Sequence, residues 1–97
     1  MDSNLRDDTD EIWWIYIIET QCGKLYTGIT NHLLRRWQQH NTGKGAKYFR
    51  GRSPRSVVYL ELSENRSAAS KREYAIKQLG TRAKRALVNE FSELTRL

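Results

Sequence analysis

The sequence predicts a small α+β domain (a mixed α/β fold class), in which a three-stranded antiparallel sheet is flanked by helices in the order ββαβαα. Its 97 residues, 38% of them apolar, are enough for one hydrophobic core and too few for two. Two segments rich in β-branched and aromatic residues, 13–19 and 24–30, follow each other closely, which is the pattern of a β-hairpin. Apolar residues then recur at helical spacing in 66–79 and 81–94.

The first strand is expected at Trp13–Glu19, where an almost continuous apolar run indicates burial on both faces of the sheet. The second is expected at Lys24–Thr30, which alternates between apolar and polar residues. The loop between them ends in Gly23, and the last residue of such a loop adopts a left-handed conformation that glycine tolerates. A third strand is expected at Ser56–Leu62.

A first helix is expected at about residues 32–42, with Asn31 as its N-cap. The residues expected to face inward are Leu33, Leu34 and Trp37. The following segment, 41–56, holds three glycines, the only proline and five basic residues. It is therefore expected to be a basic loop that contains at most a short helical turn.

Two helices are expected to follow the third strand. The first covers Arg66–Leu79 and ends at Gly80, since glycine is common just after helix C-termini. Its expected apolar side consists of Ala68, Ala69, Ala75, Ile76 and Leu79. The second helix has Thr81 as its N-cap. Its expected apolar stripe consists of Ala83, Leu87, Phe91 and Leu94.

Charge is distributed unevenly along the chain, whose formal net charge is +6. Residues 1–11 hold five acidic residues and one arginine, so they are expected to be a disordered acidic tail before a domain at 12–97. Residues 20–60 hold eight basic residues and no acidic residue. This favours a polyanionic partner, most simply the phosphates of a nucleic acid. The alternative is a solvated basic face that aids solubility.

The sequence argues against a membrane protein or a secreted protein. The longest apolar run, Ile12–Ile18, has seven residues, whereas a membrane-spanning helix needs ~20. No basic region followed by an apolar one marks a secretory signal. The single cysteine, Cys22, excludes an intrachain disulfide and a zinc site with several thiolates. We therefore expect a cytoplasmic protein.

The predicted hairpin brings two tyrosines together beside a glycine. If residues 21–23 form the loop, Tyr16 lies opposite Gly28, and Tyr26 is the diagonal neighbour of Tyr16 on the same face. A glycine beside two phenols leaves room for a ligand to approach the backbone. The alternative is that both tyrosines simply pack under the helices.

Three charged or titratable side chains on the predicted helices are candidates for chemistry. Arg36 and His40 share one helix face; the alternatives are a solvated arginine and a surface or capping histidine. Glu73 is expected at the edge of the buried face of its helix, or as the i,i+4 partner of Lys77. Arg72 falls nearer the centre of that face, so either its charge extends to solvent or the helix packs on a shifted face.

Taken in order, these residues resemble the GIY-YIG (URI) nuclease superfamily. The matching elements are Trp14-Ile15-Tyr16 for GIY, Tyr26-Thr27-Gly28 for YIG, and then Arg36, His40 and Glu73. The resemblance covers about residues 13–80. The stretches LYTGITNHLLRRWQQHNTGKGAKY and REYAIKQL look most like the short stand-alone bacterial branch, and they are also similar to the nuclease domain of eukaryotic branched-DNA resolvases.

The resemblance implies hydrolysis of a phosphodiester with a single divalent metal, Mg²⁺ or Mn²⁺, for which Glu73 is the only protein ligand. It implies that Tyr26 is the general base toward the attacking water and that Tyr16 is its neighbour in the water network. Arg36 is then the phosphate clamp, and His40 assists near the attacking side. These residue types suit the reaction, because arginine binds non-bridging oxygens in bidentate fashion and Mg²⁺ prefers oxygen ligands and retains waters.

A DNA-binding surface is expected beside these residues. Its expected members are Gly28, Arg35, Lys44, Lys47, Arg50 and Arg52. The segment Gly43–Lys47 lacks the spacing and the Ser/Thr of a P-loop, which favours a flexible basic loop over a DNA backbone. Within the same loop, Tyr48 and Phe49 either stack on an unpaired base or fix the loop to the core.

Three positions depart from the family pattern. Trp14 stands where the first motif has glycine, a change that affects packing more than chemistry. Ile29 stands where DNA-repair relatives carry a lysine. Asn89 is the only candidate for an asparagine that some relatives use near the end of the domain.

The expected function is that of a magnesium-dependent DNA endonuclease, structure-selective on branched or flapped DNA and serving DNA repair or recombination. The alternative is a non-catalytic nucleic-acid-binding module of the same fold, and a weaker third is an adaptor that acts through protein contacts. Because 97 residues leave no room for a specificity domain, either a targeting protein partner or the shape and phosphates of DNA select the substrate.

Overall fold

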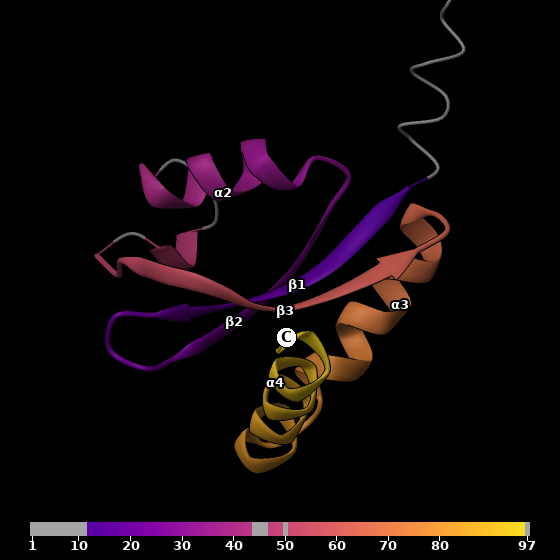
Figure 1. Cartoon of the computed structure of the whole chain (residues 1–97). Helices are drawn as coiled ribbons and strands as arrows, with labels where there is room; N and C mark the ends of the chain where they lie inside the picture. The colour runs from indigo at the N-terminus through magenta and orange to yellow at the C-terminus, as the bar shows by residue number, and fades with distance from the viewer. Residues whose placement is uncertain (1–11, 44–46, 50, 97) are drawn as a thin grey trace, which may run out of the picture.

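The computed structural model describes residues 12–43, 47–49 and 51–96. The predicted acidic tail at 1–11 lies outside these residues, as do Lys44 and Arg50. The strands are β1 (Trp13–Thr20), β2 (Leu25–Thr30) and β3 (Pro54–Ser63), and the helices are α2 (Leu33–Asn41), the short 3₁₀ turn η1 (Lys47–Phe49), α3 (Arg66–Lys77) and α4 (Thr81–Thr95). The predicted order ββαβαα is therefore confirmed, as is a short helical turn within the basic loop (Figure 1).

The three strands form one antiparallel sheet with β1 in the centre, in the order β2-β1-β3. Residues Ile15 to Ile18 of β1 are at most 2% exposed, which confirms a central strand buried on both faces. Gly23 closes the hairpin with a φ of 87°. The predicted register is also confirmed, because Tyr16 pairs with Gly28.

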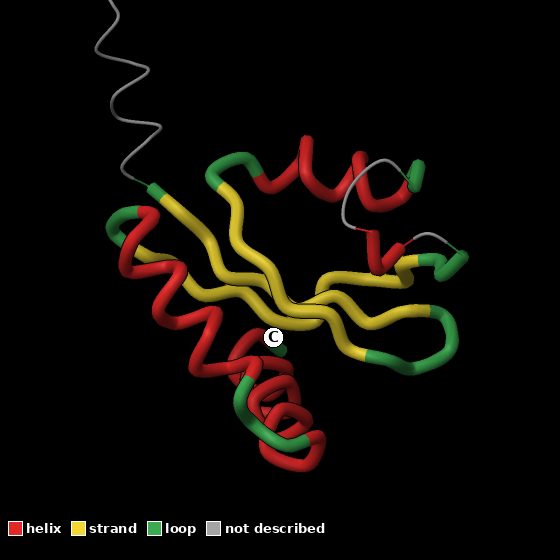
Figure 2. Tube along the Cα trace, turned by 180° about the vertical axis from the view of Figure 1, so that it is seen from behind, coloured by secondary structure: helices red, strands yellow, loops and turns green. Residues whose placement is uncertain are grey.

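Helices cover both faces of this sheet. Helices α3 and α4 lie on one face, and α2 with η1 lies on the other (Figures 1 and 2). Alternate residues of β1 face the two layers: Ile15 and Ile17 pack toward α3 and α4, whereas Tyr16 and Ile18 pack toward α2 and η1. In the described residues no helix is long and apolar enough to cross a membrane.

Helix α2 differs from the prediction at its start. Its N-cap is His32, not Asn31, and the Arg35 backbone N–H donates to the Nδ1 of His32 over 3.3 Å. Leu33 and Trp37 face the sheet, but Leu34 is 65% exposed. The reason is helical phase, since Leu33, Trp37 and His40 form the inward row and Leu34 lies about 100° away from Leu33.

The last two helices bury fewer residues than predicted. Helix α3 ends at Lys77 and buries Ala69 and Ile76, whereas Ala75 and Leu79 are exposed. The buried face of α3 is thus shifted toward Arg72. The guanidinium of Arg72 is accommodated there by a 2.9 Å ion pair with Glu61 on β3.

In α4 the N-cap is Gly80 rather than Thr81, and no side chain caps the helix. Leu87 and Phe91 pack against the core as predicted, but Ala83 and Leu94 near the two ends of the helix are exposed. The contact of α4 with the apolar core is therefore made by its middle. Near its start, Arg85 ties α4 to the hairpin by an ion pair with Glu19 of 3.0 Å and a hydrogen bond to the carbonyl oxygen of Gly23.

The core beneath α2 contains a titratable side chain, His40, which is 1% exposed. Its Nε2 lies 2.8 Å from the Oη of Tyr16, and its ring contacts Phe49 at a centroid distance of 4.5 Å. Burial lowers the pKa of His40 to about 4, and the positive charge of Arg36 acts in the same direction. His40 is therefore neutral in the native protein at neutral pH.

This burial predicts a specific dependence of stability on pH. In the unfolded chain His40 has an ordinary pKa near ~6.5, so between about pH 6.5 and 4 the unfolded state binds a proton that the native state does not. Stability should therefore be lost as pH falls through this window, by up to about 3 kcal/mol. In His40→Gln this contribution is absent. The unfolding free energies of wild type and variant, measured in urea at pH 7 and pH 4.5, should converge at the lower pH; a constant difference would contradict the prediction.

Candidate active site

The centre of the candidate site is the contact between Tyr16 and Gly28 across the hairpin. The Tyr16 side chain is buried, and a methyl group on Gly28 would lie 2.5 Å from its Oη and 2.7 Å from its Cζ. Only glycine therefore leaves room for this phenol. The space that was expected to admit a ligand is occupied by the tyrosine itself, whose Oη lies over the edge strand β2.

Tyr26 is next to this phenol on the same face of the sheet, as the register predicts. The two tyrosine rings are 6.2 Å apart between centroids. Tyr26 also meets the His40 ring edge-on at 5.4 Å and the rings of Tyr48 and Phe49 at about the same distance (5.1 and 5.0 Å). The side chain is half-buried, so it is held by rings on one side and remains accessible on another.

Electrostatic effects on Tyr16 show which charged groups surround it. Burial raises the pKa of Tyr16 to about 12, and the nearby Tyr26 and the negative charge of Glu73 add to the increase. Arg36 acts in the opposite direction, through a hydrogen bond to the phenol and through its positive charge. Tyr16 is thus a protonated phenol at neutral pH, and it can donate to the Nε2 of the neutral His40.

Arg36 reaches this cluster from α2. It lies one turn before His40, and both side chains line a small space with Tyr16, so the predicted shared helix face is confirmed. The Nη1 of Arg36 donates to the Oε1 of Gln39 over 2.9 Å. This bond and the one to the phenol of Tyr16 orient the guanidinium, and its other N–H groups are available to an anion.

Glu73 approaches from the opposite layer, on α3. It lies between the buried residues Ala69 and Ile76 on the face of α3 that packs against β1 and β2. Its side chain is 22% exposed and pairs with Lys77 over 3.2 Å. Both interpretations of Glu73 therefore have support: the ion pair with Lys77 exists, and the charge of Glu73 also acts on Tyr16.

The donor set fits a hard divalent cation. Within the described ranges, no group of three or more His, Cys, Asp or Glu residues can hold a metal ion. Glu73 contacts the ammonium of Lys77, and its charge also acts on the phenol of Tyr16, so the donors that these residues offer are oxygens, as Mg²⁺ and Mn²⁺ prefer. An ion held by one carboxylate keeps most of its waters, which leaves positions for the oxygens of a substrate.

The basic loop is fixed to the core by its aromatic residues. Phe49 is 3% exposed and packs against His40 and Tyr26, so of the two expected roles it has the structural one. Tyr48 is half-buried and has the guanidinium of Arg52 over its ring at 4.4 Å. Lys47 and Arg52 are exposed.

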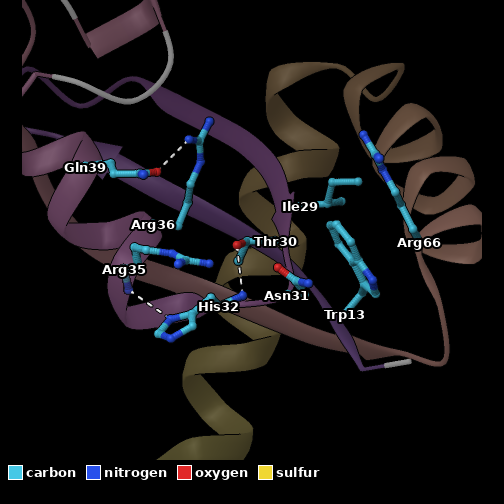
Figure 3. Close-up of a pocket in the computed structure, with 9 residues that line it drawn as sticks. All are labelled: Trp13, Ile29, Thr30, Asn31, His32, Arg35, Arg36, Gln39 and Arg66. Carbon is cyan, nitrogen blue, oxygen red and sulfur yellow. Dashed lines mark hydrogen bonds between the residues drawn. The ribbon is translucent and has the colours of Figure 1, made fainter. Parts of the chain in front are cut away.

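Two residues that the sequence analysis did not select contribute to a cavity of about 380 Å³ beside Arg36 (Figure 3). They are Trp13 and Arg66, which lie in this cavity together with Arg35. Arg66 follows an N-cap, since the Ala68 N–H donates to the Asn65 Oδ1 over 2.8 Å. A cation is unusual directly after an N-cap, because the N-terminal end of a helix is positively polarised. This unusual placement of Arg66 was the signal in the sequence that could have singled it out. Asn89 instead lines a cavity between α4 and β3, on the other face of the sheet from α2.

Comparison with known proteins agrees with this arrangement. Residues 12–86 match the family described as the GIY-YIG catalytic domain. UPF0213 protein DP2720 of Desulfotalea psychrophila is 52% identical over 85 residues, which cover 86% of this chain and 77% of that protein. UPF0213 protein YhbQ of Escherichia coli K12 is 47% identical over 85 residues, or 84% of this chain and 85% of that protein.

A solved structure is also similar. The solution NMR structure of UPF0213 protein BH0048 from Bacillus halodurans has a TM-score of 0.53 and 40% identity, and the match covers 80% of this chain and 83% of that one. The family match spans all three strands and reaches into α4. The chain therefore belongs to the GIY-YIG catalytic-domain family.

Proposed function

We propose that the protein is a metal-dependent DNA endonuclease that hydrolyses phosphodiester bonds. One observation supports this proposal: Tyr26 and Arg36 lie beside the buried phenol of Tyr16 on β1, and Glu73 lies on the face of α3 that packs against β1 and β2. A base, a phosphate-binding cation and a metal-binding carboxylate are the parts that phosphodiester hydrolysis requires. The GIY-YIG catalytic domain suggests a nuclease, and such nucleases typically use a divalent metal.

In the proposed reaction, Arg36 binds the non-bridging oxygens of the scissile phosphate. Its guanidinium is oriented by Gln39, and its fixed positive charge stabilises the negative charge that develops on these oxygens in the transition state. Mg²⁺ or Mn²⁺ bound to Glu73 would supply a Lewis-acidic charge on the same phosphate. The ion pair with Lys77 would have to open for this, and the exposed Lys77 ammonium can then be solvated by water.

The two tyrosines have different proposed roles. The half-buried Tyr26, in its phenolate form, accepts a proton from the attacking water, whose oxygen forms the new bond to phosphorus while the bond to the leaving oxygen breaks and solvent water protonates that oxygen. The high pKa of Tyr16 keeps its proton in place. Tyr16 therefore serves as a positioning residue that orients water and neighbouring side chains through its hydroxyl group.

A DNA-binding module without nuclease activity is the second candidate. The observation that favours it is the ion pair between Glu73 and Lys77, which occupies the one carboxylate that the nuclease proposal needs. The two candidates share the basic surface and differ only in whether DNA is cut. Selectivity for branched or flapped DNA, a role in repair or recombination, and a targeting partner are finer proposals that depend on cleavage being shown.

Two substitutions test the metal ligand and the clamp. Glu73→Gln keeps the size of the side chain and removes its charge, and Arg36→Ala removes the phosphate donor. Each should lower the cleavage rate by ~10²-fold or more, as loss of one key electrostatic group does. Rates are measured on labelled branched DNA with Mg²⁺, and binding is measured in EDTA, where Glu73→Gln should bind as wild type does.

The matched control for Glu73 is Lys77→Ala, which breaks the same ion pair and leaves the carboxylate. It should retain wild-type cleavage. If Glu73 were only the partner of Lys77, both substitutions would cost a few tenths of a kcal/mol of stability, roughly 0.2–0.5, and neither would change cleavage. That result, or cleavage that does not need a metal, would refute the proposed nuclease site.

The tyrosines are compared by removing one hydroxyl group at a time. Tyr26→Phe loses the proton acceptor at nearly constant shape, so the cleavage rate at saturating DNA should fall by ~10²-fold. Tyr16→Phe loses only the positioning hydroxyl, so its effect should be smaller. Single-turnover kinetics at several pH values measure both; a larger loss in Tyr16→Phe than in Tyr26→Phe would reverse the assigned roles.

A further inference from the structure

The elements that meet at one end of the sheet form a cleft of which the proposed chemistry uses only Arg36. Trp13 at the start of β1 pairs with Ser63 at the end of β3, and Trp14 pairs with Thr30 at the end of β2. Helices α2 and α3 begin shortly after β2 and β3, so their first turns lie at this same end. The resulting cavity of about 380 Å³ adjoins the candidate active site through Arg36, and Figure 3 shows its lining.

Three arginines from the two layers line this cavity, which we name the Arg35–Arg66 cleft. Arg35 and Arg36 come from α2, and Arg66 comes from α3 (Figure 3). None of the three forms an ion pair with a carboxylate in the described parts of the chain. Like charges that lie together without counter-charges repel each other, so an anion bound between them would be stabilised.

The cleft also has an apolar side. Trp13 and Ile29 lie beside each other along one wall (Figure 3). Trp13 is half-buried, and the guanidinium of Arg66 lies 5.5 Å from the centroid of its ring. A phosphate alone needs no such wall. A nucleotide does, because its base has flat faces that stack on an aromatic ring or a guanidinium.

We propose that the Arg35–Arg66 cleft binds an unpaired nucleotide of the DNA strand next to the scissile phosphate. Arg35 and Arg66 bind its backbone phosphates, and the wall formed by Trp13 and Ile29 contacts its base or sugar. In a continuous duplex the base faces are covered by neighbouring base pairs and are not available to this wall. The inference rests on the proposed nuclease function for its location, and it names the residues that would recognise DNA in which a duplex meets an unpaired arm.

The test measures binding of full-length protein in EDTA, so that nothing is cut. Two fluorescein-labelled DNAs of equal duplex length are compared by anisotropy, one with a splayed unpaired arm and one fully paired. Wild type should prefer the splayed-arm DNA. Trp13→Leu should weaken its binding ~10-fold, as loss of one stacked base does, and should leave binding of the duplex unchanged. Trp13→Phe, which keeps a ring, should retain most of the preference and serves if Trp13→Leu does not fold.

The arginines are tested by the salt dependence of the same binding. Arg66→Gln and Arg35→Gln should each reduce the slope of log K against log salt by ~1 for the splayed-arm DNA. The control is Arg82→Gln, which removes the same charge from an exposed site on α4. The fall of log K with log salt on this DNA should be steeper for this variant than for the two cleft variants.

Several results would overturn the cleft proposal. Equal losses on both DNAs in Trp13→Leu would exclude an unpaired nucleotide, and slopes unchanged in both arginine variants would exclude the cleft from the DNA path. If an RNA of the same sequence displaced the labelled DNA at a lower concentration than unlabelled DNA does, the ligand of the cleft would be RNA and not DNA. Failure of the nuclease proposal is distinguishable, because a protein without any metal-dependent cleavage would still show the Trp13-dependent preference in EDTA.

Discussion

Tyr16 can place its hydroxyl group over the edge strand only because residue 28 has no side chain, and this steric constraint organises the whole site. The phenol of Tyr16, which belongs to β1, contacts Gly28 of β2 and His40 of α2. One side chain therefore links both strands of the hairpin to a helix. The position of Arg36 follows, since it is one turn before His40. The charge of Glu73 reaches the same phenol from α3. The strand register, the placement of α2 and the charges near Tyr16 thus all depend on the contact between Tyr16 and Gly28.

A three-stranded sheet suits this arrangement because β2, which carries Tyr26 and Gly28, is an edge strand. Groups from the two helical layers can approach each other around an edge, whereas a wider sheet would separate them. The degree of burial then gives the side chains of the site different roles. The buried groups, Tyr16 and His40, have pKa values displaced so that both stay uncharged at neutral pH. The half-buried Tyr26 and Arg36 remain available to a substrate.

The elements and the hairpin register could be predicted because they depend on local sequence. A three-residue loop ending in Gly23 fixes which residues face each other, and Tyr16 opposite Gly28 follows by counting. Helix faces were less predictable. Leu34 and Leu94 have the right residue type for the core but the wrong position relative to the sheet, and Arg72 is accommodated by Glu61 on another element. The contact between Trp13 and Arg66 could not be predicted, because only the packing of α3 at the end of the sheet brings these distant residues together.

The bonds between Arg85 and the hairpin have a consequence for how the chain is made. The hairpin β1–β2 is local in sequence and can form early during synthesis, whereas its partner Arg85 lies in the last helix. Until α4 has left the ribosome, Glu19 lacks its ion pair, and Leu87 and Phe91 do not yet cover their side of the sheet. The domain therefore completes its fold only after α4 has emerged, and a nascent chain that stalls before α4 exposes an apolar sheet face to chaperones and proteases.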